Sequence, residues 1–289
     1  MSRVAYVNGR YVPFAEARVH IEDRGYQLGD GVYEVCEIRD GAFVDERRHL
    51  DRLGRSLSAL RIEMPMPLSS LRYVLRETVR RNRVTDGLLY LQVTRGVARR
   101  DHGFPETPVK PALVVTVRAL DRKKIAASAR AGISVITLPD DRWGRVDIKT
   151  IGLLPNVLAR QAAKDAGAKD AWFADEEGLI TEGASSNAWI VTREGVLLTR
   201  PSSNRILTGI TLTVIKEVAA SLQIKVEERA FTVAEAKAAA EAFLSSATQT
   251  VMPVVAIDGI PIGSGEPGPV TLRLREAFHR QAEIGPRIV

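Results

Sequence analysis

The segment RVDIKTIGLLPN, residues 145–156, places one lysine, Lys149, among apolar residues. Val146 and Ile148 alternate with Asp147, which predicts a strand ending at the lysine. A lysine in such a place ordinarily extends its amine to solvent. If the amine is partly desolvated instead, its pKa falls and it can attack a carbonyl as the free base. The segment is therefore a candidate for lysine-based covalent catalysis.

Two further segments offer groups that would complement such a lysine. TEGASSN, residues 181–187, presents the Glu182 carboxylate in an expected turn, and LTGIT, residues 207–211, opens an expected helix whose N–H groups suit a phosphate. The same turn carries three short polar side chains able to hydrogen-bond phosphate oxygens or ring substituents: Ser185, Ser186 and Asn187. An aldehyde cofactor that forms a Schiff base with lysine, and needs an acid at its pyridine nitrogen and a phosphate cradle, is pyridoxal phosphate. Taken singly, each segment is also an ordinary turn or helix cap.

Composition narrows the class of protein. A chain of 289 residues, 45% hydrophobic, predicts one large or two ordinary domains. Its 41 Lys and Arg are scattered among 35 Asp and Glu, so the net charge of +6 favours a solvated surface over a nucleic-acid site. The single cysteine, Cys36, lies in a strand pattern, which favours a core position and a reducing, cytoplasmic location. The sequence contains no apolar run of 18 residues, so it predicts no membrane-spanning helix. The four histidines lack metal-ligand spacing.

Residues 1–120 are predicted to form a smaller α+β domain. Asn8-Gly9 and Asp40-Gly41 are strong hairpin signals because their tight turns need positive φ. Leucines at helical spacing predict one helix from residue 47 and another from residue 68. Two strands are expected to follow, at 88–95 and 112–120.

Residues 121–132 lack a clear period and are predicted to form an interdomain linker. Residues 133–289 are expected to form a larger domain of mixed β structure with helices, of the α+β or α/β class. Its helices are predicted over 155–166, from near Gly209, and after a Thr232–Glu235 capping box. GSGEPG, residues 263–268, matches a dinucleotide-binding pattern, but too few residues follow it for the rest of that unit.

Six motifs follow one another along the chain: DRGYQLGDGVYEV (23–35), HLDRL (49–53), LQVTRG (91–96), RWGRVDIK (142–149), TEGASSN (181–187) and GIT (209–211). In order and spacing they resemble the motifs of the fold-type-IV pyridoxal-phosphate aminotransferases, and the resemblance covers essentially the whole chain. Within that family, RRDHGFPETPVKP (99–111) is most similar to the D-amino acid aminotransferases.

The resemblance implies roles for individual residues. Lys149 would be the Schiff-base lysine and the proton shuttle, and Glu182 would pair with the pyridine nitrogen. The other cofactor contacts that it implies are Arg52, Ile210, Thr211 and Thr248 on the phosphate and Leu207 on the ring. By position alone, Arg52 lies off the apolar stripe of its helix, which would favour solvent.

The resemblance also implies which residues contact the substrate. Tyr33 would reach the substrate, and Arg100 and His102 match a trap for the α-carboxylate that is supplied by the neighbouring subunit. Arginine suits this role because its planar fork can hold a carboxylate with two hydrogen bonds. Arg99 makes the register ambiguous by one residue, and alignment on the flanking TRG and FPE favours Arg100.

The resemblance also implies a homodimer with its active site at the subunit interface. By resemblance, the expected reaction converts D-alanine and 2-oxoglutarate to pyruvate and D-glutamate. A branched-chain L-amino acid aminotransferase, an (R)-amine aminotransferase and an aminodeoxychorismate lyase remain alternatives of the same fold. A basic nucleic-acid-binding protein is a further alternative that rests on charge alone.

Overall fold

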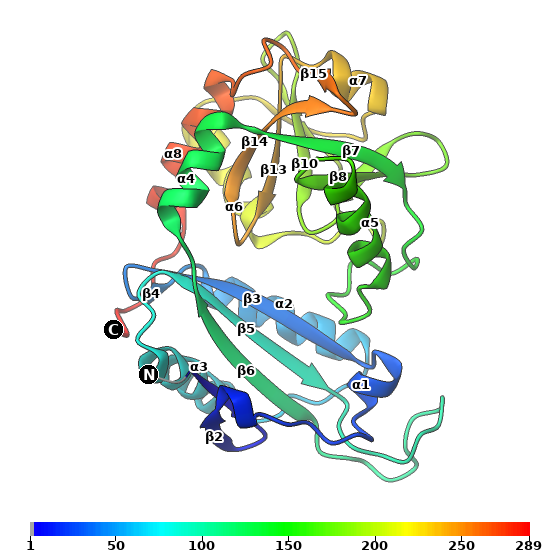
Figure 1. Ribbon diagram of the computed structural model, residues 1–289, viewed down its shortest axis with the longest axis vertical. Coiled ribbons are helices and arrows are strands. Elements are labelled where there is room, and N and C mark those ends of the chain that lie inside the picture. The colour runs from blue at the N-terminus through cyan, green and yellow to red at the C-terminus, as the bar shows by residue number, and fades with distance from the viewer. Residues whose placement is uncertain (1–2) are drawn as a thin grey trace. The chain divides into compact units, whose positions relative to one another are not determined.

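The computed structural model describes residues 3–289, and the chain divides into two compact units (Figure 1). Unit 1 contains the residues up to Asp121 together with Ile148–Gly152 and Glu283–Val289. Unit 2 contains Arg122–Asp147 and Leu153–Ala282. The chain therefore returns to unit 1 twice, and the first return carries Lys149.

Unit 1 is built on a six-stranded antiparallel sheet in the order β2-β1-β6-β5-β3-β4. Its strands are β1 (Val4–Val7), β2 (Arg10–Pro13), β3 (Gly31–Arg39), β4 (Ala42–Phe43), β5 (Gly87–Thr94) and β6 (Ala112–Ala119). Its helices are the 3-10 turn η1 (Phe14–Glu16), α1 (Arg24–Leu28), α2 (Glu46–Ala59) and α3 (Leu68–Asn82). Both predicted hairpins are confirmed, with Asn8 and Asp40 at φ values of 45° and 50°.

The core of unit 1 lies between the sheet and helices α2 and α3. Leu53 and Leu57 on α2 and Leu71 on α3 are buried against alternate residues of the strands, as the helical spacing of the leucines predicts. Cys36 lies in this core as a free thiol, and burial raises its pKa well above the ordinary value. A thiol in such surroundings is a packing residue and not a nucleophile.

Unit 2 is built on a nine-stranded mixed sheet in the order β12-β11-β10-β13-β14-β7-β8-β9, with β15 paired to β14. Its strands are β7 (Ile133–Pro139), β8 (Asp170–Ala174), β9 (Ile180–Gly183), β10 (Asn187–Val191), β11 (Leu197–Thr199), β12 (Val226–Glu228), β13 (Glu241–Ser246), β14 (Thr250–Ile257) and β15 (Ile260–Pro261). Its helices are α4 (Arg122–Ala131), α5 (Leu154–Asp165), α6 (Ile210–Ser221), α7 (Val233–Ala238) and α8 (Pro269–Gln281). The α+β architecture and the Thr232–Glu235 capping box are confirmed.

Two predicted segments have a different structure. Residues 121–132, predicted as the interdomain linker, are nearly all in α4, which belongs to unit 2 and packs Ile125 and Ala129 on its core. Residues 145–149 are not a strand: Val146 and Asp147 form a turn, where the chain passes from unit 2 back to unit 1. Among residues 3–289, no helix is both long and apolar enough to cross a lipid bilayer.

Candidate active site

Lys149 lies beside the start of strand β3 in unit 1. The Tyr33 amide donates a hydrogen bond of 3.0 Å to the Lys149 carbonyl, and Thr150 forms a bridge with Val32. These backbone contacts leave the lysine side chain over the face of β3 that carries Tyr33. Lys149 Nζ lies 4.3 Å from the centroid of the Tyr33 ring, and this ring stacks on Tyr90. The structure therefore brings together the predicted catalytic lysine and the predicted substrate-side tyrosine.

Arg52 is buried and not exposed as its position on the helix suggested. Its Nε and Nη2 donate hydrogen bonds of 2.7 and 2.8 Å to the two carboxylate oxygens of Glu34 on β3. The same carboxylate lies 2.8 Å from His49 Nδ1. Burial disfavours the charge on Glu34, but the charge and hydrogen bonds of Arg52, with His49, outweigh it and lower its pKa. The arginine is thus held in one orientation by a buried acid that the sequence did not single out.

Glu182 lies within strand β9 of unit 2, not in the turn that was predicted for it. Its Oε1 accepts a 2.5 Å hydrogen bond from Arg142 Nη1. Its Oε2 accepts bonds of 2.9 Å from Asn187 Nδ2 and 3.1 Å from the Leu207 amide. Donors of this kind, one of them a guanidinium, favour the ionised carboxylate over the acid. A buried anion of fixed orientation is what a protonated ring nitrogen requires as its partner.

Asp140 completes this cluster. It accepts hydrogen bonds of 2.8 and 2.7 Å from Arg142 Nε and Nη2, so the guanidinium spans two acids. Burial raises the pKa of Asp140, but these bonds from Arg142 outweigh burial and lower it. The sequence motifs include Arg142 but indicate no role for it. The signal for this pairing is the Asp-x-Arg spacing of residues 140–142, which is equally typical of an exposed ion pair.

The serines and the asparagine after Glu182 differ in what they can do. Ser186 is buried, and its hydroxyl donates to Asp170 at 3.1 Å, whereas Ser185 is exposed. The Asn187 amide donates to Glu182 and, at 2.8 Å, to the Leu207 carbonyl. Asn187 therefore orients both the Glu182 carboxylate and the backbone at Leu207.

Helix α6 begins beside this cluster. Its N-cap is Gly209, which offers no side chain to the first N–H groups, and Ile210 and Thr211 begin the helix as buried residues. A Cβ at residue 209 would lie 2.2 Å from Asn187 Oδ1, so any side chain there would displace the Asn187 amide. A helix of twelve residues without a side-chain cap leaves donors for an anion. Thr248 lies in the turn between β13 and β14.

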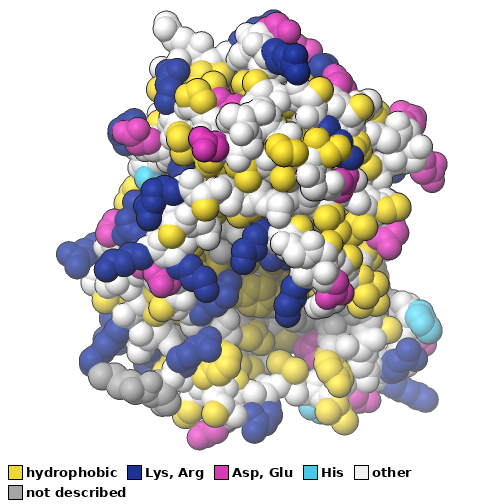
Figure 2. Space-filling view, turned by 45° about the horizontal axis from the view of Figure 1, so that its top comes forward, with side chains coloured by type: hydrophobic (Ala, Val, Ile, Leu, Met, Phe, Trp, Pro, Cys, Tyr) yellow, Lys and Arg dark blue, Asp and Glu magenta, His cyan; other side chains and the backbone are white. Residues whose placement is uncertain are grey.

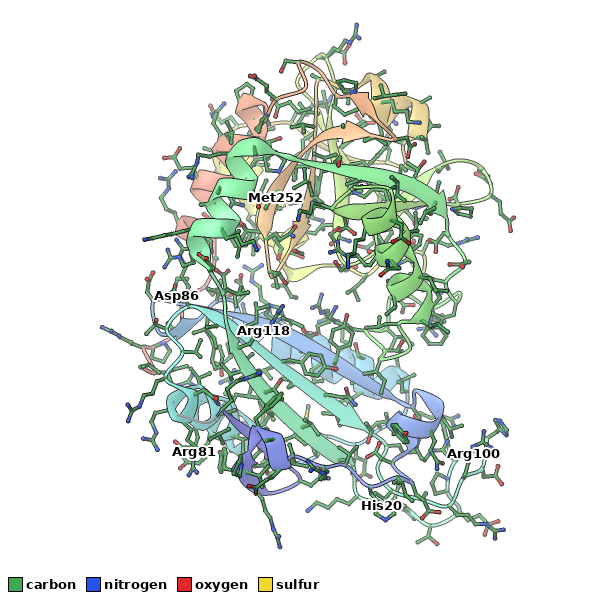
Figure 3. All side chains as sticks on the ribbon, viewed as in Figure 1. His20, Arg81, Asp86, Arg100, Arg118 and Met252 are labelled. Atoms are coloured by element: carbon green, nitrogen blue, oxygen red, sulfur yellow. The ribbon has the colours of Figure 1, made fainter. Side chains whose placement is uncertain are left out.

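Arg100 and His102 are both exposed, on the long loop of unit 1 between β5 and β6. Figure 3 shows Arg100 on the outer part of this loop, with its side chain directed away from the sheet. Of the predicted residues, Tyr33, Arg52 and Lys149 also belong to unit 1. The remaining predicted residues belong to unit 2: Glu182, Ser185, Ser186, Asn187, Leu207, Ile210, Thr211 and Thr248.

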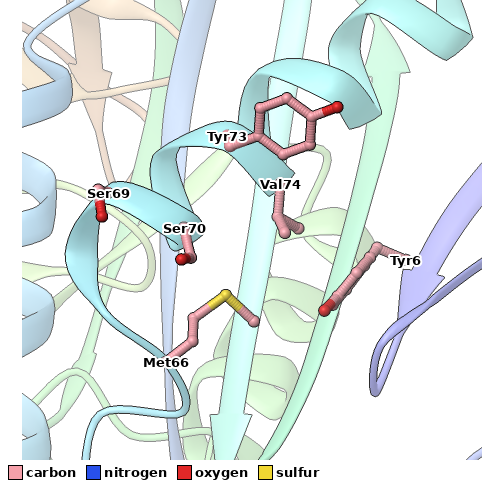
Figure 4. Close-up of a pocket in the computed structure, with 6 residues that line it drawn as sticks. All are labelled: Tyr6, Met66, Ser69, Ser70, Tyr73 and Val74. Carbon is pink, nitrogen blue, oxygen red and sulfur yellow. The ribbon is translucent and has the colours of Figure 1, made fainter.

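A pocket elsewhere on unit 1 has a different character (Figure 4). It has a volume of about 500 Å³ and is lined by Tyr6, Met66, Ser69, Ser70, Tyr73 and Val74. This lining contains no charged side chain, so it cannot neutralise a phosphate or a carboxylate. In Figure 2, Lys and Arg side chains are spread over the visible face, with Asp and Glu among them.

Similar proteins agree with the chemistry of these clusters. Residues 31–257 match the family amino-transferase class IV. The chain is 39% identical over 278 residues to a D-alanine aminotransferase of Staphylococcus haemolyticus, covering 96% of this chain and 97% of the relative. Its fold is similar to that of the branched-chain amino acid aminotransferase of Escherichia coli, with a TM-score of 0.89, 25% identity, and 97% and 94% of the two chains covered. It is also similar to a PLP-bound hypothetical aminotransferase of Mycobacterium tuberculosis, with a TM-score of 0.82, 25% identity, and 95% and 98% covered. The chain therefore belongs to the class IV aminotransferases.

Proposed function

We propose that the protein transfers the amino group of a D-amino acid, D-alanine foremost, to a 2-oxo acid, 2-oxoglutarate foremost, with pyridoxal phosphate as cofactor. The observation that carries this proposal is the conjunction of the class IV family with near full-length similarity to D-alanine aminotransferases. The motif residues in both units have the chemistry that such a reaction needs.

The residues present fit this cofactor. The buried Glu182 carboxylate, oriented by Arg142 and Asn187, suits a protonated pyridine nitrogen. The uncapped start of α6 at Ile210 suits the phosphate, and so does the guanidinium of Arg52. When bound, the cofactor supplies an electron sink for the carbanion that forms at the substrate Cα.

The chain's own groups then do the following. Lys149 Nζ would hold the cofactor through its carbonyl carbon and, as a free amine, would remove the α-proton of the amino acid. Glu182 keeps the ring nitrogen protonated, which makes the ring a better acceptor of negative charge. Tyr33 lies against the amine of Lys149 and limits where this amine can move.

Arg100 and His102 grip the substrate α-carboxylate in this proposal. Both project from an exposed loop, so we place them in the active site of a second copy and propose that the enzyme is a homodimer. The grip fixes which face of Cα presents its hydrogen to Lys149, and thereby selects the enantiomer. We also place the enzyme in the cytoplasm, where its single buried cysteine stays reduced.

A panel of amino donors tests the proposal. The D- and L-enantiomers of alanine, leucine and glutamate are supplied with 2-oxoglutarate or pyruvate, and the kcat/KM of each is measured. The proposal predicts that D-alanine exceeds L-leucine by about tenfold or more, equivalent to about 1.4 kcal/mol of transition-state binding. A preference for L-leucine would indicate a branched-chain enzyme, and pyruvate formation without an amino acceptor would indicate a lyase.

A further inference from the structure

The loop that carries Arg100 and His102 is exposed at its tip but fixed at its base. At Gly96 the backbone has a φ of 109°, and a Cβ there would lie 2.1 Å from the carbonyl oxygen of Lys110. The two ends of the loop thus pack against each other where it leaves the sheet. The Arg24 amide also donates to the Gly96 carbonyl at 2.9 Å.

A buried arginine holds the middle of the loop. Arg24 is 2% exposed, and its Nη1 donates a 2.7 Å hydrogen bond to the carbonyl oxygen of Asp101. Asp101 is the residue between Arg100 and His102. A contact that fixes the peptide of Asp101 constrains where the side chains on both sides of it leave the backbone. No side chain of Arg100 or His102 needs to be buried for this constraint to operate.

Asp30 orients the arginine. Its carboxylate accepts 2.8 Å hydrogen bonds from Arg24 Nε and Arg95 Nε and a 3.0 Å bond from Arg95 Nη2. Burial raises the pKa of Asp30, but the bonds from Arg95 and Arg24 outweigh burial and lower it. The guanidinium of Arg95 lies 3.8 Å from the centroid of the Phe104 ring, further along the same loop. One partly buried acid thus organises two arginines, and each arginine holds a different point of the loop.

We propose that Arg24, through its hydrogen bond to the Asp101 carbonyl, is a positioning residue that sets the geometry of the carboxylate grip, with Phe104 on Arg95 as its second attachment. This rests on the proposed function for the roles of Arg100 and His102. Arg24 itself does not touch the substrate. Its effect is to keep the loop in the binding conformation before the substrate arrives, which lowers the cost of ordering on binding.

Arg24→Lys tests the attachment itself. Lysine retains a positive charge beside Asp30, but its single nitrogen cannot occupy the positions of both Arg24 Nε and Nη1, which donate to Asp30 and to the Asp101 carbonyl. Phe104→Ala is the second variant and is tolerated by the fold because Phe104 is half-exposed. Arg18→Lys, on an exposed arginine of the same N-terminal region, is the matched control.

Two measurements are made on each holoenzyme variant. The first is the rate of tryptic cleavage at Arg99 and Arg100 in the native protein, which reports local opening of the loop. We expect an increase of about tenfold or more in Arg24→Lys, since a hydrogen bond from a charged group is lost, and a smaller increase in Phe104→Ala. Arg18→Lys should cleave at the parent rate and keep the parent urea midpoint.

The second measurement is steady-state kinetics. KM for D-alanine should rise about fivefold or more in Arg24→Lys with kcat within about twofold, because preorganisation of a binding group is lost and the reacting groups are untouched. Unchanged cleavage in both variants, or faster cleavage with an unchanged KM, overturns the proposal. Arg100→Ala distinguishes a failure of the proposed function from a failure of this inference. If it leaves KM for D-alanine unchanged, the proposed role of Arg100 fails, while the cleavage rates still report on the attachment of the loop by Arg24.

Discussion

Arg142 Nη1 lies 2.5 Å from Glu182 Oε1, and Nε and Nη2 of the same guanidinium donate hydrogen bonds to the Asp140 carboxylate. The acid proposed to face the ring nitrogen is therefore preorganised by a fixed positive charge. Groups that are preorganised in this way act without reorientation during the reaction, which is why their removal has large effects on rate.

Glu182→Gln should still bind the cofactor, because the proposed phosphate contacts are untouched, but should lose about 10²-fold or more in kcat, since a neutral amide does not keep the ring nitrogen protonated. Cofactor absorbance and single-turnover rates measure the two properties. The matched control is Glu177→Gln, an exposed acid of the same region, which should react at the parent rate. A Glu182→Gln rate within about twofold of the parent would place this acid outside the chemistry.

Borohydride reduction of the loaded enzyme should fix one cofactor per chain on Lys149. This lysine is the one that combines a position against Tyr33 with the predicted motif. Peptide mass mapping identifies the modified residue, and Lys164, on helix α5, is the internal comparison. A label on Lys164 or any other lysine would end the proposed mechanism.

Arg100→Ala should lower kcat/KM for D-alanine by about 30-fold or more, because truncating one partner of a charge pair that is buried, as proposed for Arg100 and the substrate carboxylate in the second copy's active site, costs roughly 2–5 kcal/mol. An amine without a carboxylate, such as (R)-1-phenylethylamine, should be spared if it reacts. Arg99→Ala, the exposed neighbour, is the control and should do much less. A larger loss in Arg99→Ala than in Arg100→Ala would show that the register of the grip was assigned to the wrong arginine.

Glu34 should make the enzyme acid-sensitive. Its pKa in the folded protein is lowered from the ordinary value of 4.5, so its ion pair with Arg52 contributes stability above that pH and loses it as the pH falls further. The urea midpoint of the parent should therefore decline below about pH 4.5. Glu34→Gln should be less stable at neutral pH, by about 3–5 kcal/mol, because it leaves Arg52 buried without a counter-charge, and should show a shallower decline in acid.

The control for that experiment is Glu16→Gln, on an exposed acid of η1. Its urea midpoint should follow that of the parent at every pH. A Glu34→Gln profile parallel to that of the parent would assign the acid sensitivity to other carboxylates.

Local sequence signals predicted much of the fold. The hairpins at Asn8 and Asp40 followed from positive φ, and helices α2 and α3 from the helical spacing of their leucines, because each depends on a few neighbouring residues. Helix α4 was missed because its small and basic residues show little apolar period, although they favour helix.

The hydrogen-bond partners of the site residues could not be predicted from local sequence patterns. Glu34 meets Arg52 across 18 positions of sequence, and Arg142 meets Glu182 across 40. Sequence motifs indicated which residues carry chemistry, but pairings over such separations arise only when strands and helices are assembled. The burial of Arg52 follows from the same cause, since the acid that neutralises it comes from another element.

The passage of the chain between the units has a consequence for the order of events during synthesis. Residues 148–152 and 283–289 complete unit 1, the first along β3 and the second beside β4, where Ile284 bridges Val44 and the Ile288 amide bonds to Gly41. A ribosome makes both segments after the strands that they join, and the second after all of unit 2. While the nascent chain still lacks them, the edges of β3 and β4 have no partner there and are open to pairing with another chain. We therefore expect residues 283–289 to pair with unit 1 late, after its other strands and helices have been synthesised.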